Sequence, residues 1–240
     1  PSSGDIVGNR PSSPRLNTGF RVGLGIASAI LVIGAGLLYL SLQYEYLALS
    51  RMRSDPEAAL SHAATAHTLF PLSPDPFVIR HDVYRTVAQE IALHPEGASS
   101  RKPAVADSLA LSLASAERAI LEDPAGWRVH YRAGVATLVL LAERFPEQAY
   151  GSQAKSWLEE RAALNAQESA SNREHPPIPS DWAADVTATE RPPADALLTL
   201  EADALLARAR NHLESAKNRN PLEPMLLQAL EALPPAQNTS

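Results

Sequence analysis

The chain has 240 residues, of which 45% are hydrophobic and 20% charged, with 20 prolines, 11 glycines and no cysteine. That length is typical of one or two domains with a real core, and the absence of cysteine excludes disulfide frameworks, cysteine-based zinc sites and iron–sulfur centres. The net charge of −6 argues against a nucleic-acid-binding protein, whose affinity depends on a basic face.

Residues 1–19 are rich in proline, serine and glycine, which predicts a flexible arm. Because the chain begins at Pro1, we expect it to be processed, truncated or cut from a longer protein. The next stretch, Val22 to Leu42, has 21 residues without a charge, enough for a helix of about 30 Å, the thickness of a bilayer's hydrocarbon core. This run exceeds the apolar part of a signal peptide and no A-x-A-like cleavage site follows it, so we predict a permanent transmembrane helix over 20–43.

Basic residues flank this span unequally. Arg10, Arg15 and Arg21 precede it, whereas only Arg51 and Arg53 follow closely. The positive-inside rule therefore favours a cytoplasmic N-terminus in the inner or plasma membrane, with the rest of the chain on the periplasmic side. The span is also rich in small residues, which let helix backbones approach closely in lipid, and we predict packing against another transmembrane helix. The residues chosen for that packing are Gly23, Ala27 and Gly34.

Beyond the span, apolar residues recur at three- and four-residue steps, as in Val105, Leu109 and Leu113. This periodicity predicts helices over 103–122, 127–144, 146–170, 194–218 and 222–233, interrupted at 94–103 and 171–193. No segment has the period-two alternation of a strand, so the predicted fold class is all-α. The expected domains are a helical domain (44–170), a Pro-rich excursion (171–193), a C-terminal helical pair (194–233) and a tail (234–240).

One spacing occurs three times: small residues at i, i+4 and i+7 and a proline five residues later. Such residues share one helix face and admit a neighbouring helix, and the proline then ends the helix. The three sets are Ala59, Ala63, Ala66 and Pro71; Ser112, Ala116, Ala119 and Pro124; and Ala209, Leu213, Ala216 and Pro221.

This spacing resembles the second helix of a tetratricopeptide repeat, and Phe77, Tyr84 and Gly134 fall at further positions of that pattern. The resemblance implies a degenerate solenoid of helical hairpins behind the transmembrane helix. The prolines are 53 and 97 residues apart, rather than multiples of 34, so insertions must separate the units. A generic alanine-rich helical bundle is the alternative interpretation.

A transmembrane helix that leads into a helical segment with A-x-x-LFPLSPDPFVIR also resembles the carboxyl end of O-antigen ligase and polymerase-type membrane glycosyltransferases. Those enzymes carry out their chemistry in a many-helix membrane domain that these residues do not contain. This second resemblance implies a non-catalytic tail.

No catalytic or nucleotide-binding motif occurs in the sequence. We expect solvated or capping roles for all seven histidines, and solvated helix faces for the carboxylates at 159–160, 201 and 203. No metal site or cofactor is predicted, and we expect no enzyme activity.

A stacked helical domain can offer a groove to a peptide or helix, and aromatic residues commonly anchor such contacts. The candidate contact residues are Phe77, Tyr84, Trp127, Tyr131 and Trp182, although a core position is favoured for the first three. The main hypothesis is a non-catalytic accessory subunit or scaffold of a larger membrane complex, for which photosynthetic or respiratory assemblies are natural hosts. Its partners would be other membrane subunits and the bilayer, with no nucleic acid or small-molecule substrate. The alternatives are the glycosyltransferase tail and a membrane-anchored peptide-binding adaptor.

Overall fold

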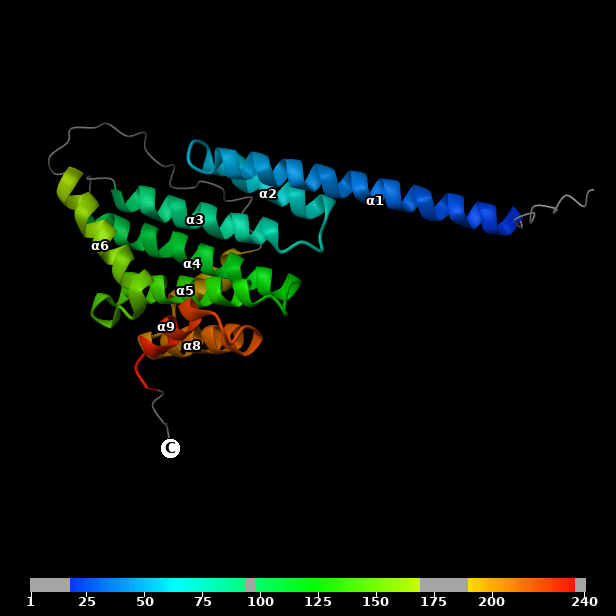
Figure 1. Cartoon of the computed structure of the whole chain (residues 1–240). Coiled ribbons are helices and arrows are strands. Elements are labelled where there is room, and N and C mark those ends of the chain that lie inside the picture. Colours follow the sequence, from blue (N-terminus) through cyan, green and yellow to red (C-terminus); the bar gives the residue numbers. More distant parts are fainter. Residues whose placement is uncertain (1–17, 94–97, 169–189, 236–240) are drawn as a thin grey trace, which may run out of the picture.

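The computed structural model describes residues 18–93, 98–168 and 190–235, and this part of the chain is helical with no β-strand. Figure 1 shows one long helix projecting from a body built by all the others. The all-α prediction, with a long N-terminal apolar helix ahead of a helical domain, is confirmed. The elements are α1 (Thr18–Arg51), α2 (Pro56–Leu69), α3 (Asp75–Leu93), α4 (Ala98–Glu122), α5 (Trp127–Arg144), η1 (Pro146–Gln148), α6 (Gly151–Glu168), α7 (Arg191–Leu198), α8 (Ala202–Arg219) and α9 (Pro224–Glu231).

The projecting helix α1 is also part of the domain. It runs without a break past residue 43, the expected end of the span, and its last turns pack antiparallel to α2. The Ser41 hydroxyl donates a hydrogen bond to the carbonyl of Ala66 (3.1 Å). The turn back into α2 is fixed by Asp55, whose side chain accepts from the backbone N–H of Ala58 (3.0 Å) as an N-cap. One continuous helix therefore joins the apolar span to the domain.

Three helical hairpins, α1/α2, α3/α4 and α5/α8, stack in that order (Figure 1). Neighbouring hairpins are joined through α2 packing on α3 and α4 packing on α5. The third hairpin is split, because residues 145–201 lie between its two helices. Within that insertion α6 packs on α5, α3 and α9, whereas α7 packs on α4. The insertion explains the long interval between the second and third prolines of the repeat.

The residues of the repeated spacing occupy equivalent places in the three hairpins. All nine small or apolar residues ahead of the prolines are at most 2% exposed. In each hairpin the residue just before the proline donates its backbone N–H to the carbonyl of the last of them. These bonds run from Phe70 to Ala66 (3.0 Å), from Asp123 to Ala119 (3.0 Å) and from Asn220 to Ala216 (2.9 Å). The spacing is therefore a structural repeat of helix and turn.

The predicted helix over 194–218 is two helices in the structure. The chain turns between α7 and α8, because α7 lies on α4 while α8 lies on α5. Arg144 stabilises this break by donating from Nη1 to the carbonyls of Leu197 (3.3 Å) and Leu200 (2.6 Å). Two other boundaries differ: α4 begins at Ala98 instead of 103, and Gly151, with φ 82°, makes a sharp turn into α6 that a side chain would disfavour.

Candidate functional site

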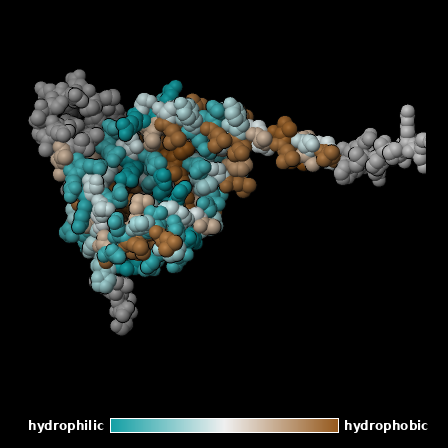
Figure 2. Space-filling model, in the orientation of Figure 1, coloured by the Kyte–Doolittle hydropathy of each residue, from teal (hydrophilic) through white to brown (hydrophobic). Residues whose placement is uncertain are grey.

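The projecting part of α1 carries most of the large hydrophobic side chains that are exposed in the described residues. It is long and apolar enough to cross a membrane, and none of its most apolar 18-residue window is buried by the rest of the chain. Figure 2 shows this hydrophobic surface continuing from the helix onto the adjoining edge of the domain. Such a length of exposed apolar surface requires a lipid or protein environment.

The three small residues predicted to pack in the membrane share one face of α1. At about 100° per residue, Gly23, Ala27 and Gly34 lie within about 40° of one another. A Cβ atom added at Gly23 or Gly34 would meet nothing within 4 Å. The same face continues towards the C-terminus, where Ser41, Glu45 and Ala48 are buried against α2. One continuous stripe of α1 is thus covered by α2 inside the domain and uncovered along the span.

A buried ion pair holds the start of α7 on the second hairpin. Arg80 of α3 and Glu190, just ahead of α7, form a direct contact, with side chains 8% and 3% exposed. Next to them, Arg191 pairs with Asp107 of α4. Burial raises the pKa of Tyr84, which lies among these groups. Two links from α7 therefore fix the chain to both helices of the α3/α4 hairpin.

His81 makes a second polar link, between α3 and α4. Its Nδ1 lies 3.0 Å from the Ser112 carbonyl and 2.8 Å from the Ser112 hydroxyl, which itself donates to the His81 carbonyl (2.9 Å). Nδ1 is therefore the protonated nitrogen. Asp82 lies 3.8 Å from Nε2 and pairs with Arg132 of α5 instead (2.9 Å). A Ser–His–Asp proton relay is not formed, because the serine proton points to a carbonyl and the carboxylate is not bonded to the ring.

This position corrects the expectation that all seven histidines are solvated or capping residues. His81 and His130 are buried, whereas His175 lies outside the described residues. His130 Nε2 lies 3.2 Å from the carbonyl of Pro124, in the turn after α4. The expected exposure of the carboxylates is confirmed at Glu159, Glu160, Glu201 and Asp203.

We expect the stability of the domain to fall below pH 6.5 because of the buried histidines. Burial holds the pKa of His81 below its usual value of 6.5, with Asp82 opposing the shift. Below pH 6.5 the imidazole of His81 binds a proton more readily in the unfolded chain than in the folded chain. The contribution of neutral His81 to the free energy of unfolding is therefore fully present above pH 6.5 and is lost as the pH falls. Melting temperatures at pH 7.5 and 5.5 should differ less in His81→Gln than in the native chain. Part of the difference should remain, because burial also lowers the pKa of His130. An equal pH dependence in both proteins would contradict this role of His81.

A third polar group joins α4 to α8. Glu117 accepts from Arg208 Nη2 (2.7 Å) and lies 3.0 Å from His212 Nε2. Burial alone would raise the pKa of Glu117, but the hydrogen bonds from His212 and Arg208 outweigh it and hold the pKa below its usual value of 4.5. The group is partly buried and bridges the second and third hairpins. Its role is structural.

The predicted contact aromatics separate into two groups. Phe77 and Tyr84 are interior side chains, 4% and 0% exposed, so they serve packing and offer no side-chain surface to a partner. Trp127 and Tyr131 lie one turn apart on α5, partly exposed, with ring centroids 6.4 Å apart. Trp182 lies outside the described residues.

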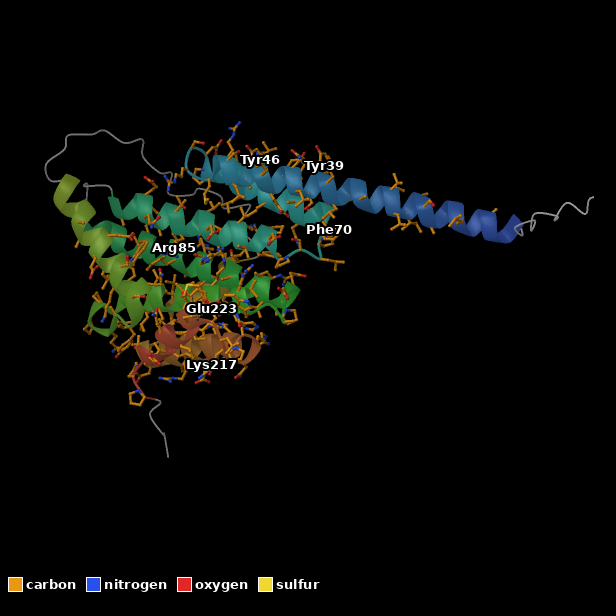
Figure 3. All side chains as sticks on the ribbon, viewed as in Figure 1. Tyr39, Tyr46, Phe70, Arg85, Lys217 and Glu223 are labelled. Atoms are coloured by element: carbon orange, nitrogen blue, oxygen red, sulfur yellow. The ribbon has the colours of Figure 1, made fainter. Side chains whose placement is uncertain are left out.

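The Trp127–Tyr131 pair lies on a face with charges from two other helices. Burial raises the pKa of Tyr131, Glu223 raises it further, and Arg85 of α3 opposes the rise. Figure 3 shows Arg85 and Glu223 on the same side of the domain. Tyr131 therefore lies near Arg85 of α3 and near Glu223, just ahead of α9, and its ring and that of Trp127 are both partly exposed.

The interior polar links escaped the sequence analysis. Arg80, Glu190 and Arg144 act at long range in the chain, and no local pattern pairs them. Only the link between His81 and Ser112 had a sequence signal. Ser112 occupies a small-residue position of the repeat at which the other two segments have alanine. The described residues contain no group of three histidine and acidic side chains that could hold a metal ion. No protein family, no curated protein and no solved structure matches this chain.

Proposed function

We propose that the protein is a non-catalytic, single-pass membrane subunit that binds and stabilises a larger membrane protein complex. The observation that carries the proposal is the shared face of α1: the stripe that buries Ser41 and Ala48 against α2 continues as Gly23, Ala27 and Gly34, which none of the other described residues covers. A helix of another subunit seated on that stripe would continue the packing that α2 begins. Small residues there permit the close approach on which helix association in lipid depends.

The unbroken α1 gives this subunit a rigid design. Because the same helix carries the span and the first hairpin, the domain cannot tilt relative to the span unless the helix bends. A partner bound along the span would therefore also meet the domain at a fixed height and orientation. The partly exposed Trp127 and Tyr131 are the contact residues that the domain would offer.

The proposed orientation places the helical domain on the periplasmic side. Arg21 immediately precedes the apolar run and belongs to the basic side of the span. The residues beyond it are acidic overall, with 18 basic and 26 acidic side chains after subtraction of the three arginines and one aspartate up to Arg21 from the totals of 21 and 27. The positive-inside rule itself counts the basic residues near the span, and three arginines precede it against two that follow closely.

We expect Gly23→Leu with Gly34→Leu to release the partner subunits while leaving the protein in the membrane. The added side chains would stand on the stripe and hold a neighbouring helix away. Co-purification after extraction in mild detergent should fall several-fold in this double variant. The matched control is Gly25→Leu with Gly36→Leu, which adds the same atoms about 200° away on the opposite face, where no atom of the described residues lies within 4 Å of an added Cβ either.

The control pair should retain the partners. Equal loss in both double variants would show that the added bulk acts without regard to face and would contradict the packing role of the stripe. Partners retained in both would place the binding site elsewhere on the protein.

A further inference from the structure

The turns that end α2, α4 and α8 form one edge of the domain, which we call the turn edge (residues 70–74, 121–126 and 220–225). A chain of contacts puts them side by side. The His67 and Phe77 rings lie 4.7 Å apart, and Phe77 packs with Ala119 and Val129. Arg219 Nε then donates to the carbonyl of Pro124 (2.9 Å), joining the last two turns.

This edge is also the place where α1 leaves the domain. Ser41 is level with Ala66 through their hydrogen bond, and the rest of α1 towards its N-terminus projects beyond α2. Figure 3 shows Tyr39 of α1 and Phe70 of the first turn at this end of the molecule. The turns therefore face in the direction in which the apolar span runs.

Each of the three turn regions exposes a leucine. Leu72 and Leu222 directly follow the repeated prolines and are 77% and 87% exposed, and Leu121, in the last turn of α4, is 68% exposed. Met225 adds a fourth, half-exposed apolar side chain. Isolated exposed leucines need no explanation, but these recur at one edge across all three hairpins.

The depth of the first turn, at 70–74, fits the boundary of a bilayer. Helix α2 continues for three residues past Ala66, a rise of about 5 Å, before the first turn. The turn is therefore level with α1 about 5 Å inside the end of the apolar run at Leu42. Interfacial segments bury their apolar side chains about 5–10 Å into the headgroup and acyl boundary.

We infer that Leu72, Leu121 and Leu222 insert into the lipid bilayer that α1 crosses, so that the domain rests on the membrane by its turn edge. The charged residues of the turn edge are Glu122, Asp123 and Glu223, with Arg128 and Arg219 just outside it, so the edge lacks the basic excess that would favour anionic headgroups. A partner helix on the α1 stripe would cover only about 10 Å of the edge. The remaining width, beneath α4, α5 and α8, faces lipid.

This inference rests on the proposed membrane anchoring, and a single experiment separates the two. The chain has no cysteine, so each introduced cysteine is a unique labelling site. The full chain carrying Leu72→Cys or Leu222→Cys is labelled with an environment-sensitive fluorophore and reconstituted into phosphatidylcholine vesicles, with and without doxyl-labelled lipid as quencher. A label at Val32→Cys, within the span, is the control for a site in the bilayer. A label at Ser54→Cys, exposed at the opposite end of the domain, is the control for a site in water.

Labels at 72 and 222 are expected to show blue-shifted emission and several-fold stronger quenching by doxyl lipid than the label at 54. Quenching at 32 combined with water-like behaviour at 72 and 222 would overturn the inference and leave the anchor standing. An unquenched label at 32 would overturn the anchor and the inference together. If cysteines at 72 and 222 are water-exposed in vesicles but protected from thiol reagents in the native membrane, a protein covers the edge and the lipid contact is refuted.

Discussion

Replacing Glu190 by glutamine is expected to destabilise the domain by about 3–5 kcal/mol, the cost typical of leaving one member of a buried ion pair without its counter-charge. The Arg80 side chain is only 8% exposed, so bulk water screens its charge little. The pair also holds the chain where it re-enters the fold ahead of α7. We therefore expect the variant to loosen the attachment of α7 to α4 and to lower the melting temperature of the full chain in detergent micelles.

Two control variants make this result specific to the buried charge. Arg80→Met combined with Glu190→Leu removes both charges and should recover much of the loss, because a well-packed apolar pair can replace a buried ion pair. Arg51→Gln breaks an exposed pair with Asp55, 3.9 Å apart, and should cost no more than about 1 kcal/mol. If Glu190→Gln lowers the free energy of unfolding no more than Arg51→Gln does, the Arg80–Glu190 pair does not hold the chain ahead of α7.

Replacing Leu213 by alanine is expected to destabilise the domain by about 2–5 kcal/mol, as for other buried leucines whose removal leaves a cavity. Leu213 of α8 is fully buried and lies opposite Gly134 of α5. A Cβ atom added at Gly134 would approach Leu213 Cγ and Cδ2 to 2.8 Å. The two helices of the third hairpin therefore meet where the glycine leaves room for the leucine.

The contact between Gly134 and Leu213 predicts that the effect of Gly134→Ala on the free energy of unfolding changes sign when Leu213 is replaced by alanine. In the native chain the added methyl overpacks the contact, at a cost of about 1–3 kcal/mol that outweighs the gain of about 1 kcal/mol in helix propensity. In the Leu213→Ala background the space is open, so Gly134→Ala should stabilise the protein. A double-mutant cycle of unfolding free energies measures this coupling. Additive effects would contradict the close approach of α5 and α8.

The repeated spacing was the most informative feature of the sequence for the fold. Small residues at i, i+4 and i+7 with a following proline identified three helix ends, because burial, close helix approach and chain reversal all depend on residues near one another in the chain. The approximate bounds predicted for the helix over 127–144, from its helical periodicity, agree with α5. The tetratricopeptide resemblance itself stays a prediction, as does the resemblance to a glycosyltransferase tail.

Other features depend on contacts between distant parts of the chain. The break between α7 and α8 is set by two different packing partners and by Arg144, 53 residues before Leu197. The sequence favoured a core position for Phe77 and Tyr84, and both are buried, but it kept them as contact candidates because an aromatic residue in an amphipathic helix suits a core or a surface. The packing role of the face shared by Gly23 and Ser41 could not be predicted from the sequence, because it depends on α2, which covers one end of that face.

The central claim, that this protein is built into a larger membrane complex, is tested most directly by extracting the native protein from its own membranes in mild detergent and identifying by mass spectrometry what co-migrates with it. The account predicts stoichiometric membrane subunits in one large assembly, lost from the Gly23→Leu/Gly34→Leu variant and retained with the opposite-face control. A protein that migrates alone, with no stoichiometric company, would contradict it.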